Sequence, residues 1–147
     1  MAKFLYRMQN VLDVKFKMED QARSAFADAM ANFNLEEEKM AAIVARREYY
    51  EAEGRKLRED ILDPFKMRDN GYAIDNLKEQ EAAQQLRVDE AAKDLERARN
   101  KLQTAMQERK TQEKLKENAF EDFKRELNAA ESKEVDELVS YRFGNSN

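Results

Sequence analysis

Apolar residues recur at alternating intervals of three and four along the first part of the chain. Seventeen positions follow this spacing, and twelve of them are apolar. The positions are Leu5, Met8, Leu12, Lys15, Glu19, Ala22, Phe26, Ala29, Phe33, Glu36, Met40, Ile43, Arg47, Tyr50, Gly54, Leu57 and Ile61. Because such a repeat keeps one narrow face of a helix against a partner helix, it predicts a coiled-coil helix over about residues 4–62.

Helix-breaking residues gather directly after this stripe. An Asp-Pro pair at residues 63–64 predicts the end of the first helix, and an Asn-Gly pair at residues 70–71 suits a turn before the next. We interpret residues 63–72 as the bend of a hairpin. Phe65 and Met67 lie within it, and we expect them to cover the end of the coil, with a contact to a partner as the alternative.

A second stripe predicts the returning helix over about residues 73–142. Eight of its ten positions are apolar: Ile74, Leu77, Glu81, Gln84, Val88, Ala91, Leu95, Ala98, Leu102 and Ala105. A polar stretch follows at residues 107–114, and apolar spacing then returns in a shifted phase, which predicts a stutter in the supercoil. Residues 143–147 are predicted to be a frayed polar tail. The fold class is therefore all-α, with residues 1–147 forming one antiparallel coiled-coil hairpin of two long helices.

The position of the bend also predicts which residues face each other. Facing positions should have numbers that sum to about 135, since the chain doubles back through residues 63–72. This register places Phe33 opposite Leu102. It also places Glu19 opposite Lys116, an ionic pair within the seam that would fix the register.

Composition argues against catalysis. The chain has no histidine and no cysteine, which removes the usual general base and the thiolate metal ligands. The carboxylates at residues 36–38 and 134–137 are expected on a solvated face, and no glycine-rich phosphate loop is present. We predict no catalytic residues, no metal and no cofactor.

Charge and hydropathy narrow the partners. The net charge is −4 with acids and bases interspersed, so nucleic acid is not an expected partner. Apolar runs are far shorter than the roughly 20 residues that span a bilayer, and no signal-peptide centre is found. The sequence predicts a cytoplasmic protein without direct membrane insertion.

Two groups of aromatic residues are candidates for protein contacts. Tyr49 and Tyr50 are adjacent on a helix, so they cannot both point into the seam, and Tyr72 is expected near them across the hairpin. The other group joins the two ends of the chain, residues 3–8 and 139–143, which both combine aromatic and basic side chains. An antiparallel hairpin should bring these ends to one pole.

Several segments resemble a known family. They are Lys3-Phe4-Leu5-Tyr6-Arg7-Met8-Gln9-Asn10-Val11-Leu12-Asp13, Gln107-Glu108-Arg109-Lys110 with Glu113-Lys114-Leu115, and Asp136-Glu137-Leu138-Val139-Ser140-Tyr141-Arg142. Together they resemble the flagellar export protein FliJ family, in its Gram-positive form. The resemblance covers essentially the whole chain.

The resemblance implies a soluble component of the flagellar type III export apparatus. Such a protein would sit in the pore of the hexameric export ATPase FliI, as a central stalk sits in rotary ATPases. It would also touch the membrane export gate FlhA and escort export chaperones. Its implied place is the cytoplasm, peripherally at the inner face of the cell membrane at the flagellar base.

Carried onto this sequence, the family's contacts fall on two sets of residues. The ring-facing candidates are Phe4, Tyr6, Arg7, Tyr141 and Arg142. The candidates for binding the gate are Tyr49, Tyr50, Tyr72 and Leu77. At other positions of the family's gate-binding surface, this chain has Glu38, Ala42, Ala45 and Gln84, which depart from the family pattern.

A function of another class is a general coiled-coil holdase chaperone or scaffold. It would suppress the aggregation of unrelated proteins, whereas a stalk would bind one ring.

Overall fold

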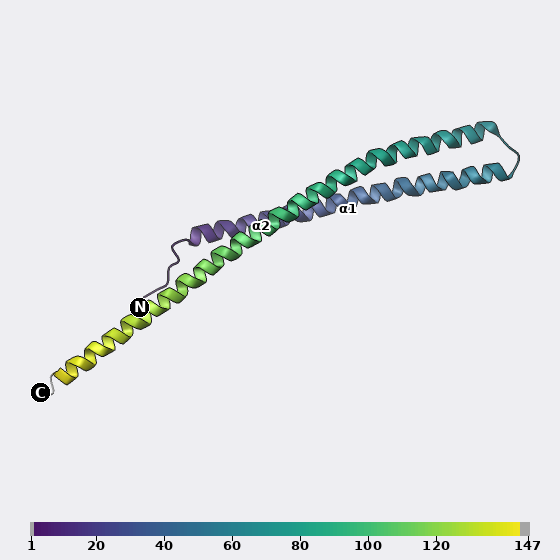
Figure 1. Ribbon diagram of the computed structural model, residues 1–147. Coiled ribbons are helices and arrows are strands. Elements are labelled where there is room, and N and C mark those ends of the chain that lie inside the picture. The colour runs from purple at the N-terminus through teal and green to yellow at the C-terminus, as the bar shows by residue number, and fades with distance from the viewer. Residues whose placement is uncertain (1, 145–147) are drawn as a thin grey trace. The chain divides into compact units, whose positions relative to one another are not determined.

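The structure is a computed structural model that describes residues 2–144, and this part of the chain is built from two helices. Helix α1 spans Gln9–Glu59 and helix α2 spans Pro64–Gly144. They run antiparallel, which confirms the predicted all-α hairpin (Figure 1). Contacts group the chain into two compact units, Ala22–Leu102 and the paired segments Met1–Gln21 and Gln103–Asn147.

The seam between the helices follows the predicted stripes. Every stripe position from Leu12 to Leu57, and every one from Ile74 to Ala105, is buried or half-buried. The most deeply buried apolar residues are Leu12, Leu77, Ala91, Leu95 and Ala105. No side chain in residues 2–144 is less than 2% exposed, so the seam is thin, as expected for two helices.

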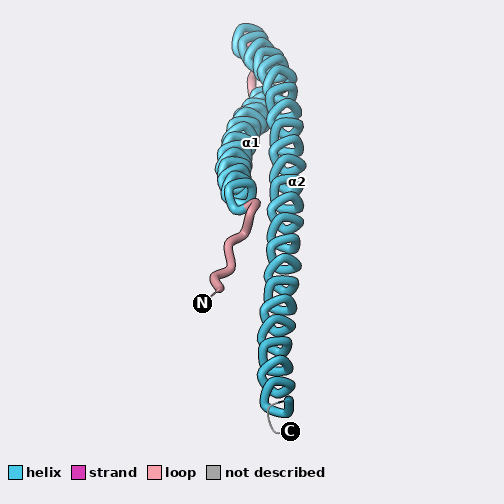
Figure 2. Tube along the Cα trace, turned by 90° about the vertical axis from the view of Figure 1, so that its left-hand side faces the viewer, coloured by secondary structure: helices cyan, strands magenta, loops and turns pink. Residues whose placement is uncertain are grey.

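The two ends of the first stripe were predicted wrongly. Leu5, Met8 and Ile61 are 80%, 48% and 92% exposed because they lie outside α1, which begins at Gln9 and ends at Glu59. Residues 2–6 are not helical (Figure 2). The ring of Phe4 packs against α2 instead. Outside a helix, the heptad spacing no longer places a side chain in the seam.

The bend is shorter and earlier than predicted. It comprises residues 60–63, and α2 starts at Pro64, so residues 64–72 are helical. Asp63 caps the helix, since its Oδ1 accepts hydrogen bonds from the backbone N–H groups of Phe65 at 3.0 Å and Lys66 at 3.4 Å. Proline suits the first helical position because its missing N–H would have no intrahelical partner there. The Asp-Pro pair therefore starts the second helix and does not stop the first.

The short bend changes the register of the unit Ala22–Leu102. Glu36 pairs with Gln84, and Arg47 pairs with Glu81, so the facing numbers sum to 120 and 128. The predicted sum of about 135 is wrong by about 11 residues, or about 16 Å along a helix axis. Phe33 and Leu102 therefore do not face each other.

Asn70 also has a different role from the one predicted. It lies inside α2, and its Nδ2 donates a hydrogen bond to the backbone oxygen of Tyr50 at 2.8 Å. Gly54 makes room for this contact, because a Cβ at that position would lie 2.5 Å from Asn70 Oδ1. The Asn-Gly pair does not form a turn, and Gly71 has no left-handed backbone.

The predicted stutter does not fall within the polar stretch of α2. In the unit formed by the chain ends, the seam side of α2 keeps the same three-four spacing through the polar stretch. The half-buried positions with this spacing are Arg109, Gln112, Lys116, Ala119 and Phe123, and Leu127 follows after a second step of four. The aliphatic parts of long polar side chains fill the seam positions of the polar stretch, while their polar end groups form hydrogen bonds or ion pairs. The seam therefore continues through this stretch without apolar residues.

Polar residues of the first stripe form cross-helix pairs. Lys15, Glu19, Glu36 and Arg47 each contact a polar side chain of α2. The pairs are Lys15–Glu108 at 3.0 Å, Glu19–Arg109 at 2.6 Å, Glu36–Gln84 at 2.5 Å and Arg47–Glu81 at 2.7 Å. We call these pairs the polar layers. No buried side-chain nitrogen or oxygen in residues 2–144 lacks a hydrogen-bond partner.

Cysteine pairs test the register, because the natural chain has no cysteine. We expect Gly54→Cys with Asn70→Cys to form an intramolecular disulfide under mild oxidation, since a Cβ at 54 lies 3.4 Å from Asn70 Cγ. Phe33→Cys with Leu102→Cys is the control that represents the register of about 135. Non-reducing gel mobility measures both. Efficient crosslinking of the control within one monomer, and not of the first pair, would overturn the observed register.

The Glu36 layer predicts a dependence on pH. The hydrogen bond from Gln84 lowers the pKa of Glu36 below its ordinary value of 4.5, against the opposing effect of desolvation, and Lys39 adds a smaller lowering. Because the folded pKa is depressed, this stabilisation is present above pH 4.5 and is lost as pH falls through the folded pKa. We expect Gln84→Leu to raise the pKa of Glu36, measured by NMR titration of the carboxyl carbon. An unchanged pKa would contradict this origin.

Candidate functional site

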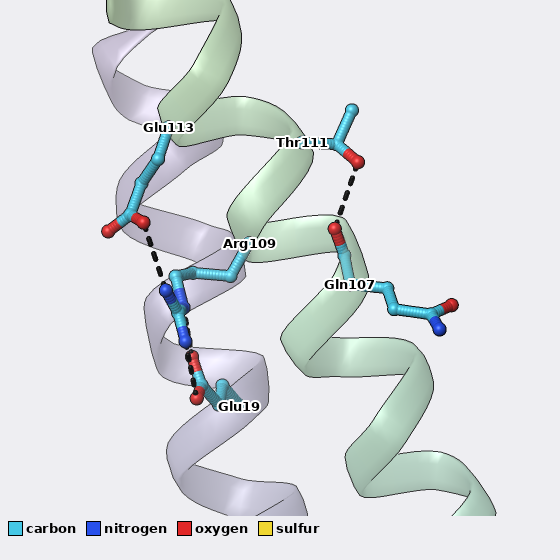
Figure 3. Close-up of polar contacts among 5 residues, drawn as sticks. All are labelled: Glu19, Gln107, Arg109, Thr111 and Glu113. Atoms are coloured by element: carbon cyan, nitrogen blue, oxygen red, sulfur yellow. Dashed lines mark hydrogen bonds and ion pairs between the residues drawn. The ribbon is translucent and has the colours of Figure 1, made fainter.

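A buried ionic layer joins Glu19 to Arg109 in the unit formed by the chain ends. Arg109 donates to both carboxylate oxygens of Glu19, from Nε at 2.6 Å and from Nη2 at 3.2 Å, and its Nη1 donates to Glu113 at 2.9 Å (Figure 3). The Glu19 side chain is only 6% exposed. The hydrogen bond with Glu19, followed by that with Glu113, raises the pKa of Arg109, so the guanidinium is charged at every accessible pH.

This layer corrects the predicted partner of Glu19. The sequence places a cation opposite Glu19, which is confirmed, but the cation is Arg109 and not Lys116. Lys116 donates to Gln9 Oε1 at 2.7 Å, nearer the chain ends than the Lys15–Glu108 pair. The reason is again the short bend, which shifts all facing pairs.

The same layer gives a structural role to several residues of the segment 107–115. Arg109 binds both Glu19 and Glu113, Glu108 binds Lys15, and Thr111 Oγ1 donates to the backbone oxygen of Gln107 at 2.9 Å. The two seam-facing members of the block, Arg109 and Gln112, occupy heptad positions. Sequence analysis missed their role, although the heptad places Lys15 and Glu19 in the seam and so predicts charged partners on the other helix.

The N-terminal segment is fixed by an aromatic cluster. The Phe4 ring lies 5.1 Å from the Phe120 ring and 5.5 Å from the Phe123 ring, between centroids. An open groove of about 520 Å³ adjoins the cluster and is lined by Phe4, Gln9, Leu12, Phe16, Glu113, Lys116, Glu117 and Phe120. Phe4 thus binds α2 of its own chain, and Tyr6 is half-buried, whereas Arg7 is exposed.

The two ends of the chain do not form the joint pole that was predicted. Phe4 lies against Phe120 and Phe123, while Tyr141 is 18 residues, or about 27 Å of helix, beyond Phe123. Because the bend is shorter than predicted, the N-terminal segment packs against an earlier part of α2 than expected. The end of α2 therefore continues beyond this segment. All residues from 128 to 144 are exposed, including Tyr141 at 69% and Arg142. We call residues 128–144 the α2 extension, and residues 145–147 of the predicted tail lie outside the described part.

As predicted, Tyr49 and Tyr50 are not both buried. Tyr49 is 60% exposed and Tyr72 is 64% exposed, and Tyr50 is half-buried. The rings of Tyr49 and Tyr50 meet edge to face with centroids 5.5 Å apart. Leu77 differs, because it is 3% exposed in the seam and so does not present its side chain to a partner.

The carboxylates do not gather into a metal site. Within residues 2–144, no group of three or more acidic side chains converges on a point that could hold a metal ion. In the same residues, no helix is long and apolar enough to cross a membrane. What the structure offers are exposed aromatic, basic and apolar side chains on helices.

Fold and surface define this chain as an all-α helical hairpin with exposed aromatic and basic side chains. A family model described as the flagellar FliJ protein matches residues 4–147. The chain therefore belongs to the FliJ family, which makes it a component of flagellar protein export, and this family is not one of catalysts. No curated protein and no solved structure matches the chain.

The Glu19 layer predicts that a single substitution lowers the stability of the fold more than a paired substitution does. Glu19→Ala leaves the Arg109 guanidinium in the seam without its main partner, and we expect the free energy of unfolding to fall by about 2 kcal/mol. Glu19→Leu with Arg109→Leu removes both charges from the seam, and we expect stability within about 1 kcal/mol of the natural chain. Urea denaturation followed by circular dichroism measures both, and equal losses would contradict the pairing.

Proposed function

We propose that this chain is the central-stalk-like partner and regulator of the export ATPase FliI, and that it links this ring to the export gate FlhA. The α2 extension carries the proposal, since residues 128–144 are helical and exposed and are not covered by α1. A single helix is narrow enough to enter the pore of a ring, whereas a paired segment is about twice as wide. Family membership supports the same assignment.

The ring-facing residues we propose are Arg7, Tyr141 and Arg142. Tyr141 and Arg142 are exposed near the end of α2, and tyrosine and arginine are the side chains that most often anchor protein interfaces. Phe4 has a different role in this proposal. It holds the N-terminal segment on Phe120 and Phe123, which keeps the adjacent Arg7 in a defined place.

The mechanism we propose is mechanical and allosteric. One helix cannot match the symmetry of a hexameric ring, so it contacts the six subunits unequally. Unequal contacts favour different nucleotide states in different subunits, and any such coupling is reciprocal in binding free energy. The chain would therefore both bias the ring and respond to it.

The gate-binding surface we propose is the exposed pair Tyr49 and Tyr72. Both rings are more than half exposed, so they can be buried by a partner without breaking the seam. Tyr50 supports Tyr49 through its edge-to-face contact. Binding of export chaperones, and a cytoplasmic place at the membrane beneath the flagellum, complete the proposal.

ATPase measurements on the cognate ring test the proposal. We expect the full chain to change the rate of ATP hydrolysis. Tyr141→Ala with Arg142→Ala should raise the concentration needed for half the effect by about thirtyfold, the loss typical of two interface anchors. Glu131→Ala with Lys133→Ala, on the same exposed extension, is the matched control and should change little.

A second variant separates the two proposed surfaces. Tyr49→Ala with Tyr72→Ala should leave the effect on the ring intact and weaken binding to the gate's cytoplasmic domain. If the natural chain has no effect on the ring, the stalk function is wrong. Suppression of aggregation of unrelated proteins at near-equal ratios would instead favour a holdase.

A further inference from the structure

The bend and the α2 extension both expose apolar side chains. At the bend, Phe65 is 70% exposed, so the expectation that it covers the end of the coil is wrong. Residues 58–68 carry as many acids as bases, so their charge selects no partner. The α2 extension differs, because the chain itself carries a surface that complements it.

The apolar face of the α2 extension is formed by Val135, Leu138 and Val139. These residues are 56%, 64% and 46% exposed. Their spacing of three and four residues places them on one side of the helix. Because all of residues 128–144 are exposed, this face is open to a partner.

The groove beside the aromatic cluster of Phe4 has an apolar lining that suits this face. Its volume is about 520 Å³, and it is lined by Phe4, Leu12 and Phe16 from the first residues of the chain and by Phe120 from α2. Phe16 and Phe120 are 40% and 41% exposed. Helix α2 is continuous from the groove to the α2 extension, so the extension cannot fold back into the groove of its own chain. A second copy of the chain has no such restriction.

We propose that two copies of this chain associate in antiparallel orientation through residues 113–142 of α2, and that each places its apolar face in the groove of the other. Facing positions then have numbers that sum to about 255, so Val135 lies against Phe120 of the second copy. Leu138 lies against position 117, which also lines the groove. The contact extends over about 44 Å of helix. Because it is two-fold symmetric, it fills both grooves and ends at two copies.

Opposite charges face each other in this alignment. Glu113 faces Arg142 of the second copy, Lys124 faces Glu131 of the second copy, and the symmetry repeats each pair. Lys124 and Glu131 each lie four residues from one of the apolar contacts, and therefore on the same side of α2. The side chains of Glu113 and Lys124 are 38% and 48% exposed, so they are accessible to a second copy.

Other alignments bring like charges together. Sliding one helix by a heptad places Glu131 opposite Glu117 in one direction, and opposite its own copy in the other. Parallel pairing would place every charge opposite its own copy. In the proposed alignment, Glu117 faces Leu138 and keeps its contact with Lys114 of the same helix at 3.5 Å. The net charge of −4 on each chain opposes association, so the dimer is weak.

This inference goes beyond the proposed stalk function and does not depend on it. A chain in the dimer has its α2 extension against a second copy, so it cannot place the extension in a ring at the same time. The experiments below use the isolated chain, and their failure leaves the ATPase result unchanged. With the chain at about 1 µM in the ATPase measurement, below the dissociation constant expected for the dimer, it is monomeric there.

Sedimentation equilibrium of the full chain, from about 1 to 300 µM, tests the association. We expect a monomer–dimer equilibrium with a dissociation constant of about 10 µM, at the weak end of the range for protein interfaces. Val135→Ser with Leu138→Ser should weaken the dimer at least about tenfold, because two buried apolar contacts are lost from each copy. Leu86→Ser with Leu115→Ser, two exposed leucines outside the contact, is the matched control and should change little.

A charge exchange tests the alignment. Lys124→Glu sets acid against acid at both symmetric places, and we expect the dimer to weaken at least about tenfold. Adding Glu131→Lys to the same chain restores opposite charges, and the dissociation constant should return to within about threefold of the natural value. Lys133→Glu makes the same change in charge nine residues from Lys124, on the opposite side of the helix, and should change little.

A single cysteine gives a second readout that needs no loss of contacts. Position 128 lies next to the two-fold axis, and the natural chain has no cysteine, so a disulfide of Asn128→Cys can only join two chains. We expect Asn128→Cys to form this disulfide under mild oxidation and Lys133→Cys not to form one. A chain that stays monomeric at about 300 µM, or a dimer that keeps its strength in the Val135→Ser, Leu138→Ser variant, would overturn the inference. Equal crosslinking of the two cysteine variants, or a charge exchange that fails to restore the dimer, would do the same.

Discussion

The register of the helix pair depends on the polar layers. A heptad stripe rich in alanine permits several alignments, because sliding one helix by a heptad again brings apolar residues together. Polar residues in the seam oppose such sliding, because each of them needs a hydrogen-bonding or ionic partner directly across the seam. In the observed register Glu19 pairs with Arg109, and Arg47 pairs with Glu81. A shift by one heptad would separate both pairs. Buried ionic pairs add little net stability, so their main contribution here is to select one alignment.

The register in turn decides what the chain displays. With a bend of four residues, the N-terminal segment reaches only to Phe120 and Phe123, and the remainder of α2 is left as a single helix. A bend of ten residues, as the sequence suggested, would have placed Phe4 opposite residue 131 and left a shorter part of α2 uncovered. The α2 extension, which carries Tyr141 and Arg142, is thus a consequence of how the turn at Asp63 and Pro64 is made.

The surfaces of the chain are chemically distinct and separately testable. The α2 extension offers Tyr141 and Arg142, and the helix segments near the bend offer the exposed Tyr49 and Tyr72. The bend itself exposes Ile61 and Leu62. None of these surfaces takes side chains from the seam, so substitution in one of them leaves the helix pairing in place. A component of an export machine can in this way hold several contacts on two helices.

The sequence by itself determined the fold class, the antiparallel pairing and the seam. Heptad spacing placed every stripe residue from Leu12 to Leu57 correctly, because helical periodicity is a local property that the side chains carry. The sequence also showed that Tyr49 and Tyr50 could not both be buried.

Only the tertiary structure decided the bend, the register and hence the partners of Glu19 and Phe4. All of these depend on whether Pro64 follows the end of one helix or begins the next. Both arrangements are possible locally, and the contacts between the two helices select one of them. The burial of Leu77, the exposure of Ile61 and the uncovered α2 extension follow from that choice.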